Sequence, residues 1–150
     1  MNPKNIRKIM RRISLYPPYL GAGIKLKKFN DDFTCFEVEL KMKWFNRNLF
    51  GTHFGGSLYA MSDPFFVFIV LNYLGNEYVV WDKSAKINFI KPGKGTVKGI
   101  FKIEKSKLQE IKEEIDIVGK NTYIFIGEIK NSENEIVAKV EKEVYVRKKE

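Results

Sequence analysis

Apolar and polar residues alternate along most of this chain, but one stretch near its middle is apolar on nearly every side. Alternation with a period of two is typical of strands that bury one face. A stretch without a polar face predicts a helix that is buried on most sides, here from about Gly55 to Leu74. The alternating segments predict strands at about Ile24 to Phe29, Phe33 to Trp44, Tyr78 to Ile90, Gly95 to Lys102, Asn121 to Ile129 and Ile136 to Arg147.

Two other segments repeat apolar residues at helical spacing. Lys105 to Val118 has charged residues between the apolar ones and predicts a surface helix. Pro3 to Ser14 predicts a basic amphipathic helix that Pro17-Pro18 terminates. Such a helix can rest on a membrane surface, but more often it packs on its own domain, and we favour packing. The face that would pack consists of Ile6, Met10 and Ile13.

The order of these elements predicts an α+β fold. A helix that is apolar all round needs a sheet curled about it, and here such a helix is followed by a run of antiparallel strands. The 150 residues are 44% hydrophobic, which suffices for one ordinary core. No internal repeat or linker divides the chain. We therefore expect a single domain over residues 1–150 that begins with the amphipathic helix.

The formal net charge of +9 favours anionic partners: nucleic acid, anionic lipid, or a phosphate-bearing cofactor such as coenzyme A. The positive charges are dispersed and many alternate with apolar residues, which also fits an ordinary solvated basic face. No recognised RNA- or DNA-binding motif is present, so a nucleic-acid module is the weakest candidate.

The chain has one cysteine and one histidine, which limits its chemistry. Cys35 excludes an internal disulfide and lies in a strand pattern, so we expect a buried, inert thiol. No His/Cys spacing could build a zinc or two-metal site, and we expect no metal and no cofactor. There is no secretory signal pattern, and the run Phe65 to Leu74 is shorter than the ~20 residues of a membrane span. The expectation is a soluble cytoplasmic protein without an integral membrane segment.

Asp63 stands inside the apolar helix, where a carboxylate must be protonated, paired or used in chemistry. None of its helical neighbours three or four positions away can neutralise it. Two interpretations remain open: a general base acting on water, or a carboxylate that accepts hydrogen bonds from a neighbouring strand or subunit. Pro64 predicts a kink at this carboxylate, or else a tolerated irregularity of a buried helix.

Gly55-Gly56 at the start of the same helix can let a ligand approach unpaired amides, or can simply form a tight turn. Gly55 and Asp63 are eight residues apart, so at ~1.5 Å per residue their backbones lie roughly 12 Å apart along one helix. They cannot both touch one reacting carbon atom from the same chain. If they cooperate, the carboxylate comes from a second subunit across a two-fold axis, which predicts a dimer.

Two polar residues precede the glycine pair. His53 could donate to an acyl oxygen, but a lone histidine is more often a structural residue with satisfied hydrogen bonds. Asn48 could hydrogen-bond a substrate carbonyl or cap a turn, and we lean towards the cap.

The run from Asn48 to Gly56, followed by Asp63 seven residues after the second glycine, resembles the hotdog-fold thioesterases of the phenylacetate-degradation and human acyl-CoA thioesterase type. Other segments are more similar to an uncharacterised hotdog family that is described only as a domain of unknown function. The resemblance spans about Phe33 to Lys149 and implies a hotdog fold, in which a curved antiparallel sheet wraps around a long central helix. The segments that carry it are Gly51 to Ala60, Asp63-Pro64, Val80 to Ser84, Phe89 to Val97 and Val144 to Lys149.

The resemblance also implies roles for individual residues. Asp63 matches the base or nucleophile, the Gly55 amide would polarise the thioester carbonyl, and Asn48 matches a carbonyl-orienting residue. The chain departs from the family pattern at two positions. The usual histidine before the glycine pair falls on Phe54, and the serine that helps hold the attacking water falls on or near Asp82. The substrate-binding candidates are therefore Phe54, Gly56, His53, Asp82 and Ser84.

The function that this resemblance implies is an acyl-CoA thioesterase-like hydrolase, with an aspartate base and a helix-start oxyanion site at a dimer interface. The alternative is a non-catalytic protein that binds acyl-CoA or a fatty-acyl group. In both cases the expected partner is acyl-CoA or another acyl thioester, and the expected assembly is a homodimer or homotetramer without nucleic acid. Hotdog dehydratases are excluded because their motif needs a histidine in a proline-glycine setting, which this chain lacks.

Overall fold

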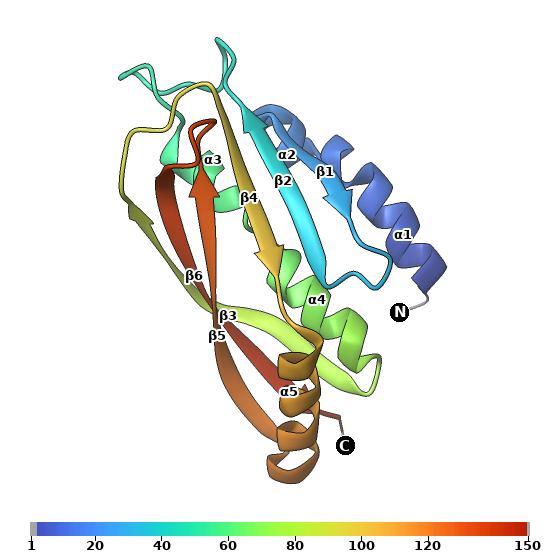
Figure 1. The fold of residues 1–150 in the computed structure, drawn as a ribbon. Helices are drawn as coiled ribbons and strands as arrows, with labels where there is room; N and C mark the ends of the chain where they lie inside the picture. The colour runs from blue at the N-terminus through green and yellow to red at the C-terminus, as the bar shows by residue number, and fades with distance from the viewer. Residues whose placement is uncertain (1–2, 150) are drawn as a thin grey trace.

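In a computed structural model that describes residues 3–149, a six-stranded sheet curls around a central helical segment (Figure 1). The α+β fold class expected from the sequence is confirmed. The helices are α1 (Pro3–Arg12), α2 (Pro17–Ala22), α3 (Gly55–Ala60), α4 (Phe65–Leu74) and α5 (Lys105–Val118), with a short 3-10 helix η1 (Ile13–Leu15). The strands are β1 (Ile24–Phe29), β2 (Cys35–Lys41), β3 (Tyr78–Phe89), β4 (Thr96–Lys102), β5 (Lys120–Lys130) and β6 (Ile136–Lys148).

The strands follow the spatial order β1-β2-β4-β5-β6-β3, so β1 and β3 form the two edges. Neighbouring strands are antiparallel throughout. The alternation in the sequence sets which residues face inward. In β2, Phe36, Val38 and Leu40 are fully buried and the residues between them are not. The predicted end of this strand at Trp44 is wrong, since the strand stops at Lys41.

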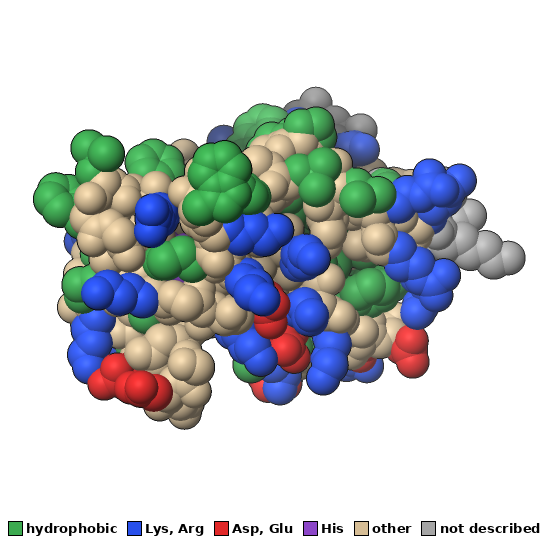
Figure 2. All heavy atoms as spheres, turned by 90° about the horizontal axis from the view of Figure 1, so that it is seen from above, with side chains coloured by type: hydrophobic (Ala, Val, Ile, Leu, Met, Phe, Trp, Pro, Cys, Tyr) green, Lys and Arg blue, Asp and Glu red, His purple; other side chains and the backbone are tan. Residues whose placement is uncertain are grey.

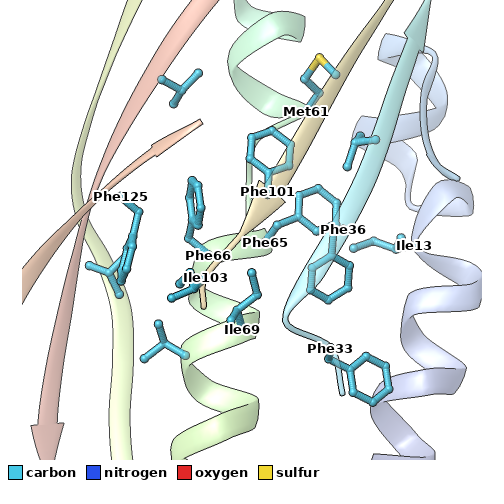
Figure 3. Close-up of a cluster of buried hydrophobic side chains, with 14 of the residues drawn as sticks. Ile13, Phe33, Phe36, Met61, Phe65, Phe66, Ile69, Phe101, Ile103 and Phe125 are labelled. Atoms are coloured by element: carbon cyan, nitrogen blue, oxygen red, sulfur yellow. The ribbon is translucent and has the colours of Figure 1, made fainter. Parts of the chain in front are cut away.

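Aromatic rings from the sheet and the central helix interlock in the core (Figure 3). The ring of Phe65 stacks on that of Phe101 with centroids 5.5 Å apart, and Phe66 meets Phe101 edge-on at 5.6 Å. Two glycines make room for Phe101, because a Cβ atom at Gly99 or Gly127 would lie 2.8 or 2.7 Å from its ring. These contacts fix how closely α4 approaches β4 and β5.

The central helical segment is broken next to Asp63. α3 ends at Ala60 and α4 begins at Phe65 with turns between them, so the kink predicted from Pro64 is confirmed and amounts to a full interruption. The hydroxyl of Tyr19 on α2 donates a hydrogen bond to the backbone carbonyl of Asp63. The interruption takes Asp63 off the helical path, and Tyr19 fixes its backbone.

Residues Gly55–Leu74 together are long and apolar enough to cross a membrane by length and composition alone, and no other helix in the described part of the chain is. In this fold the stretch forms the central helical segment inside the curl of the sheet (Figure 1). Its apolar character is explained by the aromatic core that surrounds it.

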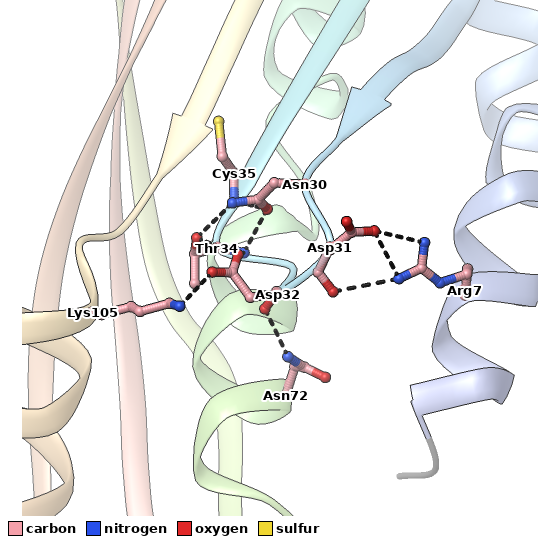
Figure 4. A network of polar contacts seen from close by, with 8 residues as sticks. All are labelled: Arg7, Asn30, Asp31, Asp32, Thr34, Cys35, Asn72 and Lys105. Atoms are coloured by element: carbon pink, nitrogen blue, oxygen red, sulfur yellow. Dashed lines mark hydrogen bonds and ion pairs between the residues drawn. The ribbon is translucent and has the colours of Figure 1, made fainter.

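The turn between β1 and β2 ties three helices together (Figure 4). Arg7 of α1 pairs with Asp31 at 3.2 Å, and Asn72 of α4 donates to the carbonyl oxygen of Asp32 at 3.3 Å. The carboxylate of Asp32 pairs with Lys105 of α5 at 2.7 Å, a contact that lowers the pKa of Asp32. Together with the buried apolar face of α1, these contacts confirm that this helix packs on its own domain.

Cys35 begins β2 beside that turn and is half-buried, less covered than the sequence suggested. Burial raises the pKa of its thiol, which keeps the thiol protonated and unreactive at neutral pH.

Candidate functional site

A buried lysine lies beside Asp63, where the sequence predicted no cation. The side chain of Lys142 on β6 is 1% exposed, and its Nζ lies 2.7 Å from Asp82 Oδ2 and 3.4 Å from Asp63 Oδ1. Nζ also donates to the hydroxyl of Tyr59 at 3.3 Å and lies over the face of that ring. These side chains form an ammonium cluster that consists of Tyr59, Asp63, Asp82 and Lys142.

The register of β3 against β6 decides which side chains enter the ammonium cluster. Asp82 and Lys142 both occupy inner-face positions of their strands. A β-bulge between Asp82 and Ser84 then shifts the register. As a result Ser84 pairs with Glu143 on the outer face and donates a hydrogen bond to its carboxylate. The bulge therefore places Ser84 outside the cluster, although the sequence made it a candidate for substrate binding.

Lys142 and Asp82 form the close ion pair of the cluster. Burial alone would lower the pKa of Lys142, but the hydrogen bond to Asp82 and the charges of Asp63 and Asp82 outweigh burial and raise it. Lys142 is therefore a cation at neutral pH. Burial raises the pKa of Asp82, and the contact with Lys142 offsets this only in part. The second oxygen of Asp82, Oδ1, is buried and has no hydrogen-bond partner among the described residues.

Asp63 is the carboxylate of the cluster that faces solvent. Its side chain is 49% exposed in the single chain, against 27% for Asp82. Because Asp82 makes the short contact that neutralises Lys142, one negative charge remains for Asp63. No helical neighbour of Asp63 neutralises it, as expected, and the cation comes instead from Lys142 on the neighbouring strand β6. The carboxylate is half-exposed and held at one oxygen, rather than buried and unpaired.

A cavity of about 500 Å³ lies at the start of α3. Its walls come from the β2–α3 loop, from α3 and from the β3–β4 connection. Three residues that the sequence singled out line it, namely Asn48, His53 and Gly55. The other lining residues are Phe50, Thr52, Leu58, Phe89, Ile90, Lys91, Pro92 and Gly93. The walls are thus mainly apolar, and no member of the ammonium cluster belongs to them.

Asn48 caps the loop that leads into α3. Its Oδ1 accepts hydrogen bonds from the backbone amides of Phe50 at 3.0 Å and Thr52 at 3.1 Å. Its Nδ2 donates to the hydroxyl of Thr52 at 2.9 Å. The cap interpretation is confirmed. Since the side-chain amide is occupied by its own loop, the structure gives the carbonyl-orienting role no support.

His53 is held as a neutral ring in the cavity wall. It is 3% exposed, and its Nε2 lies 3.0 Å from the carbonyl oxygen of Gly95. A carbonyl oxygen only accepts, so Nε2 carries the proton. Burial lowers the pKa of His53, and Nδ1 is buried without a partner in the part of the chain that the structure describes. The free nitrogen is therefore an acceptor, which favours the structural interpretation over donation to an acyl oxygen.

Gly55 and Gly56 begin α3 directly after Phe54, which is the helix N-cap. The amides at the start of a helix have no intrahelical acceptor. A Cβ atom at Gly55 would lie 2.8 Å from the ring of Phe89 across the cavity, and one at Gly56 would lie 2.5 Å from the ring of Phe54. Phe54 itself is exposed and is not among the residues that line the cavity.

The predicted residues therefore occupy two separate places in one protomer. Asn48, His53 and Gly55 line the cavity, whereas Asp63 and Asp82 belong to the ammonium cluster. Within residues 3–149, no group of His, Cys, Asp and Glu side chains is arranged to hold a metal ion.

A family model described as a domain of unknown function, DUF4442, matches residues 6–146. The chain belongs to the DUF4442 family. Comparison of this DUF4442 chain with curated proteins gives no match.

Solved structures share the fold of the DUF4442 chain at low sequence identity. A probable thioesterase of Pseudomonas aeruginosa has a TM-score of 0.83 and 14% identity, over 99% of this chain and 97% of that one. A thioesterase of Haemophilus influenzae has a TM-score of 0.66 and 14% identity, over 99% and 92%. The E. coli PaaI protein, from the phenylacetic acid degradation operon, has a TM-score of 0.65 and 16% identity, over 98% and 92%. The predicted hotdog fold is confirmed.

Removing the buried ammonium should destabilise the DUF4442 chain more than removing the exposed carboxylate. Lys142→Met removes the cation that stabilises the carboxylate of Asp82 in its partly buried site, so we expect the free energy of unfolding to fall by about 3–5 kcal/mol. Asp63→Asn should cost less than about 1 kcal/mol because the side chain is half-exposed. Urea unfolding measures both, and the double variant Lys142→Met/Asp82→Leu should recover most of the loss. Equal losses for Lys142→Met and Asp63→Asn would contradict the buried pair.

The single histidine should make the DUF4442 chain less stable in mild acid. The pKa of folded His53 lies below the ordinary 6.5, so the unfolded chain takes up a proton near pH 6.5 that the folded chain takes up only at lower pH. The free energy of unfolding should therefore fall as pH drops from neutral through 6.5 towards the folded pKa. Urea unfolding at a series of pH values should show this fall in the wild type and not in His53→Gln. An NMR titration in which the ring protonates at or above pH 6.5 would contradict it.

Proposed function

We propose that this protein is a cytoplasmic acyl-thioester hydrolase that acts on acyl-CoA and works as a homodimer. The cavity at Gly55 of one subunit is completed by Asp63 of the other. One observation carries the proposal: Asp63 is held half-exposed at a helix break by a buried ammonium, where it can face a neighbouring molecule. The similarity in fold to proteins described as thioesterases supports it.

Edge strand β3 supports the dimer. It has 12 residues and, in the single chain, no strand on its outer side. A long unpaired edge strand readily pairs with another chain. Apolar side chains near it also lack full cover, since Phe89 is 57% exposed and Val67 and Phe68 of α4 are only partly buried. A second copy along β3 covers these groups and brings its own helix break towards the cavity.

The chemistry needs one base and one donor. The Asp63 carboxylate accepts a proton from water as the water oxygen bonds to the thioester carbon. The charge that develops on the carbonyl oxygen is stabilised by the Gly55 amide. When the C–S bond breaks, the thiolate takes the proton back from Asp63. The products are a carboxylic acid and a thiol, and no other reactant is required.

Lys142 is a positioning residue in this scheme. Its contact with Asp63 at 3.4 Å restrains the carboxylate, while the shorter contact with Asp82 at 2.7 Å takes up most of its charge. The mainly apolar walls of the cavity suit an acyl chain.

Lys142 also favours a second candidate, a binder of acyl-CoA or a fatty-acyl group without turnover. The ammonium lies 3.4 Å from an oxygen of Asp63 and holds that carboxylate in an ion pair, which suits a binding site as well as a catalytic one. The chain also has Phe54 where the family pattern has a histidine.

Hydrolysis of a panel of acyl-CoAs, followed by release of free thiol, tests the proposal. The wild type should hydrolyse at least one member of the panel. Asp63→Asn should lower kcat at least ~100-fold, the usual contribution of a positioned base, while the circular dichroism spectrum and the mass in solution stay unchanged.

Asp31→Asn is the matched control, because Asp31 is an exposed carboxylate paired with Arg7 at the surface, and it should leave kcat unchanged. Hydrolysis by Asp63→Asn at the wild-type rate would overturn the proposal. Tight acyl-CoA binding by the wild type without thiol release would establish the binder instead.

A further inference from the structure

Large hydrophobic side chains project into water at one end of the molecule. They belong to residues 42–52 of the loop between β2 and α3, and this segment is called the tip loop below. Figure 1 shows the tip loop at the end of the fold where the β3–β4 connection also lies. In this loop Leu49 is fully exposed, Phe50 is 88% exposed and Trp44 is 81% exposed. Apolar side chains this exposed on neighbouring loop positions mark an interaction surface.

The same end of the molecule is cationic. Residues 40–62 and 83–103, which supply the tip loop and the β3–β4 connection, contain no Asp and no Glu. In Figure 2, which looks onto this end, a band of blue side chains runs beside the green ones, and the red ones lie mostly beyond that band. The cations of this end that form no ion pair among the described residues include Lys41, Lys43, Arg47 and Lys94.

The aromatic and cationic groups are already arranged together. The rings of Trp44 and Phe45 meet edge to face with centroids 5.5 Å apart, and Nζ of Lys43 lies 5.4 Å from the centre of the Phe45 ring. Tryptophan and phenylalanine beside lysine and arginine suit the boundary between lipid headgroups and acyl chains, where the rings enter and the cations meet phosphate.

We propose that the tip loop docks this protein peripherally on an anionic phospholipid surface. Leu49, Phe50 and Trp44 enter the headgroup region, and Lys43 and Arg47 lie against the lipid phosphates. A nucleic acid or an acidic protein could form ion pairs with the cations. Neither would offer an apolar surface that covers the protruding side chains of Leu49, Phe50 and Trp44. A lipid surface accommodates both, because it adapts to side chains that protrude from a loop rather than line a groove.

Docking in this way has a consequence for the cavity. Phe50 of the tip loop and Lys91 of the β3–β4 connection both line the cavity at Gly55. The cavity therefore lies next to the docked surface, where an acyl chain can pass between lipid and protein. The docking proposal does not rest on thioester hydrolysis and stands or fails on vesicle binding alone.

Vesicle binding can be followed inside the tip loop itself. The chain has two tryptophans, so Trp81→Phe leaves Trp44 as the only reporter. With vesicles of phosphatidylcholine and phosphatidylglycerol at low salt, the Trp44 emission should shift to the blue and the protein should sediment with the vesicles. Vesicles of phosphatidylcholine alone, or high salt, should abolish most of the binding.

Variants separate the apolar and the cationic contributions. Leu49→Ser/Phe50→Ser should weaken vesicle binding about tenfold or more. Lys43→Gln and Arg47→Gln should each weaken it roughly fivefold, the effect of about 1 kcal/mol per cation near an anionic surface. Ile117→Ser is the matched control, because Ile117 is 85% exposed on α5, away from the tip loop, and it should change nothing.

Three results would overturn the proposal. The first is a Trp44 emission wavelength that does not change when anionic vesicles are added. The second is vesicle binding that Leu49→Ser/Phe50→Ser leaves intact while oligonucleotides compete for it, which would indicate a general polyanion surface. The third is a change of mass in solution caused by Leu49→Ser/Phe50→Ser without lipid, which would make the tip loop an interface between copies of the chain.

Discussion

The ammonium of Lys142 is buried, and its pairing decides where the carboxylates of Asp63 and Asp82 lie. An unpaired ammonium in such a place costs several kcal/mol, so an adjacent element must supply a carboxylate. Asp82 does so from β3 at 2.7 Å, and Asp63 adds a longer contact from the helix break. This contact gives the aspartate at position 82 a structural role. A serine at position 82 would leave the ammonium with only the 3.4 Å contact to Asp63, so a lysine at position 142 requires a carboxylate at position 82.

Much of the fold could be predicted from the sequence because its signals are local. Alternation locates the strands, and the apolar stretch from Gly55 locates the central helix. Lys142 was missed because its partners Asp63 and Asp82 are far away in the chain, and only the strand register joins them. Its inward position in the alternation of β6 was a signal that could have been used. The bulge that turns Ser84 outward depends on pairing with β6, so no local pattern reveals it.

Within one chain, each of the two places that hold the candidate residues lacks one part of the proposed site. The cavity has apolar walls and a helix start but no carboxylate, and the ammonium cluster has a half-exposed carboxylate but no cavity. Three features favour the proposal that a second copy of the chain completes the site: the break between α3 and α4, the unpaired edge strand β3, and the partly covered apolar side chains near it. The tip loop places the cavity relative to the proposed lipid surface. Phe50 lines the cavity and belongs to the same loop as the exposed side chains of Leu49 and Trp44.

Complementation between two inactive variants tests most directly whether the site is shared across subunits. Gly55→Val fills the cavity wall, since a Cβ atom there already reaches the ring of Phe89, and Asp63→Asn removes the base. If Gly55 of one subunit works with Asp63 of its partner, a mixed dimer retains one intact site. An equal mixture refolded together should then regain about a quarter of the wild-type thioesterase activity, since half of the dimers are mixed. No recovery in dimers shown by mass to be mixed would contradict the account.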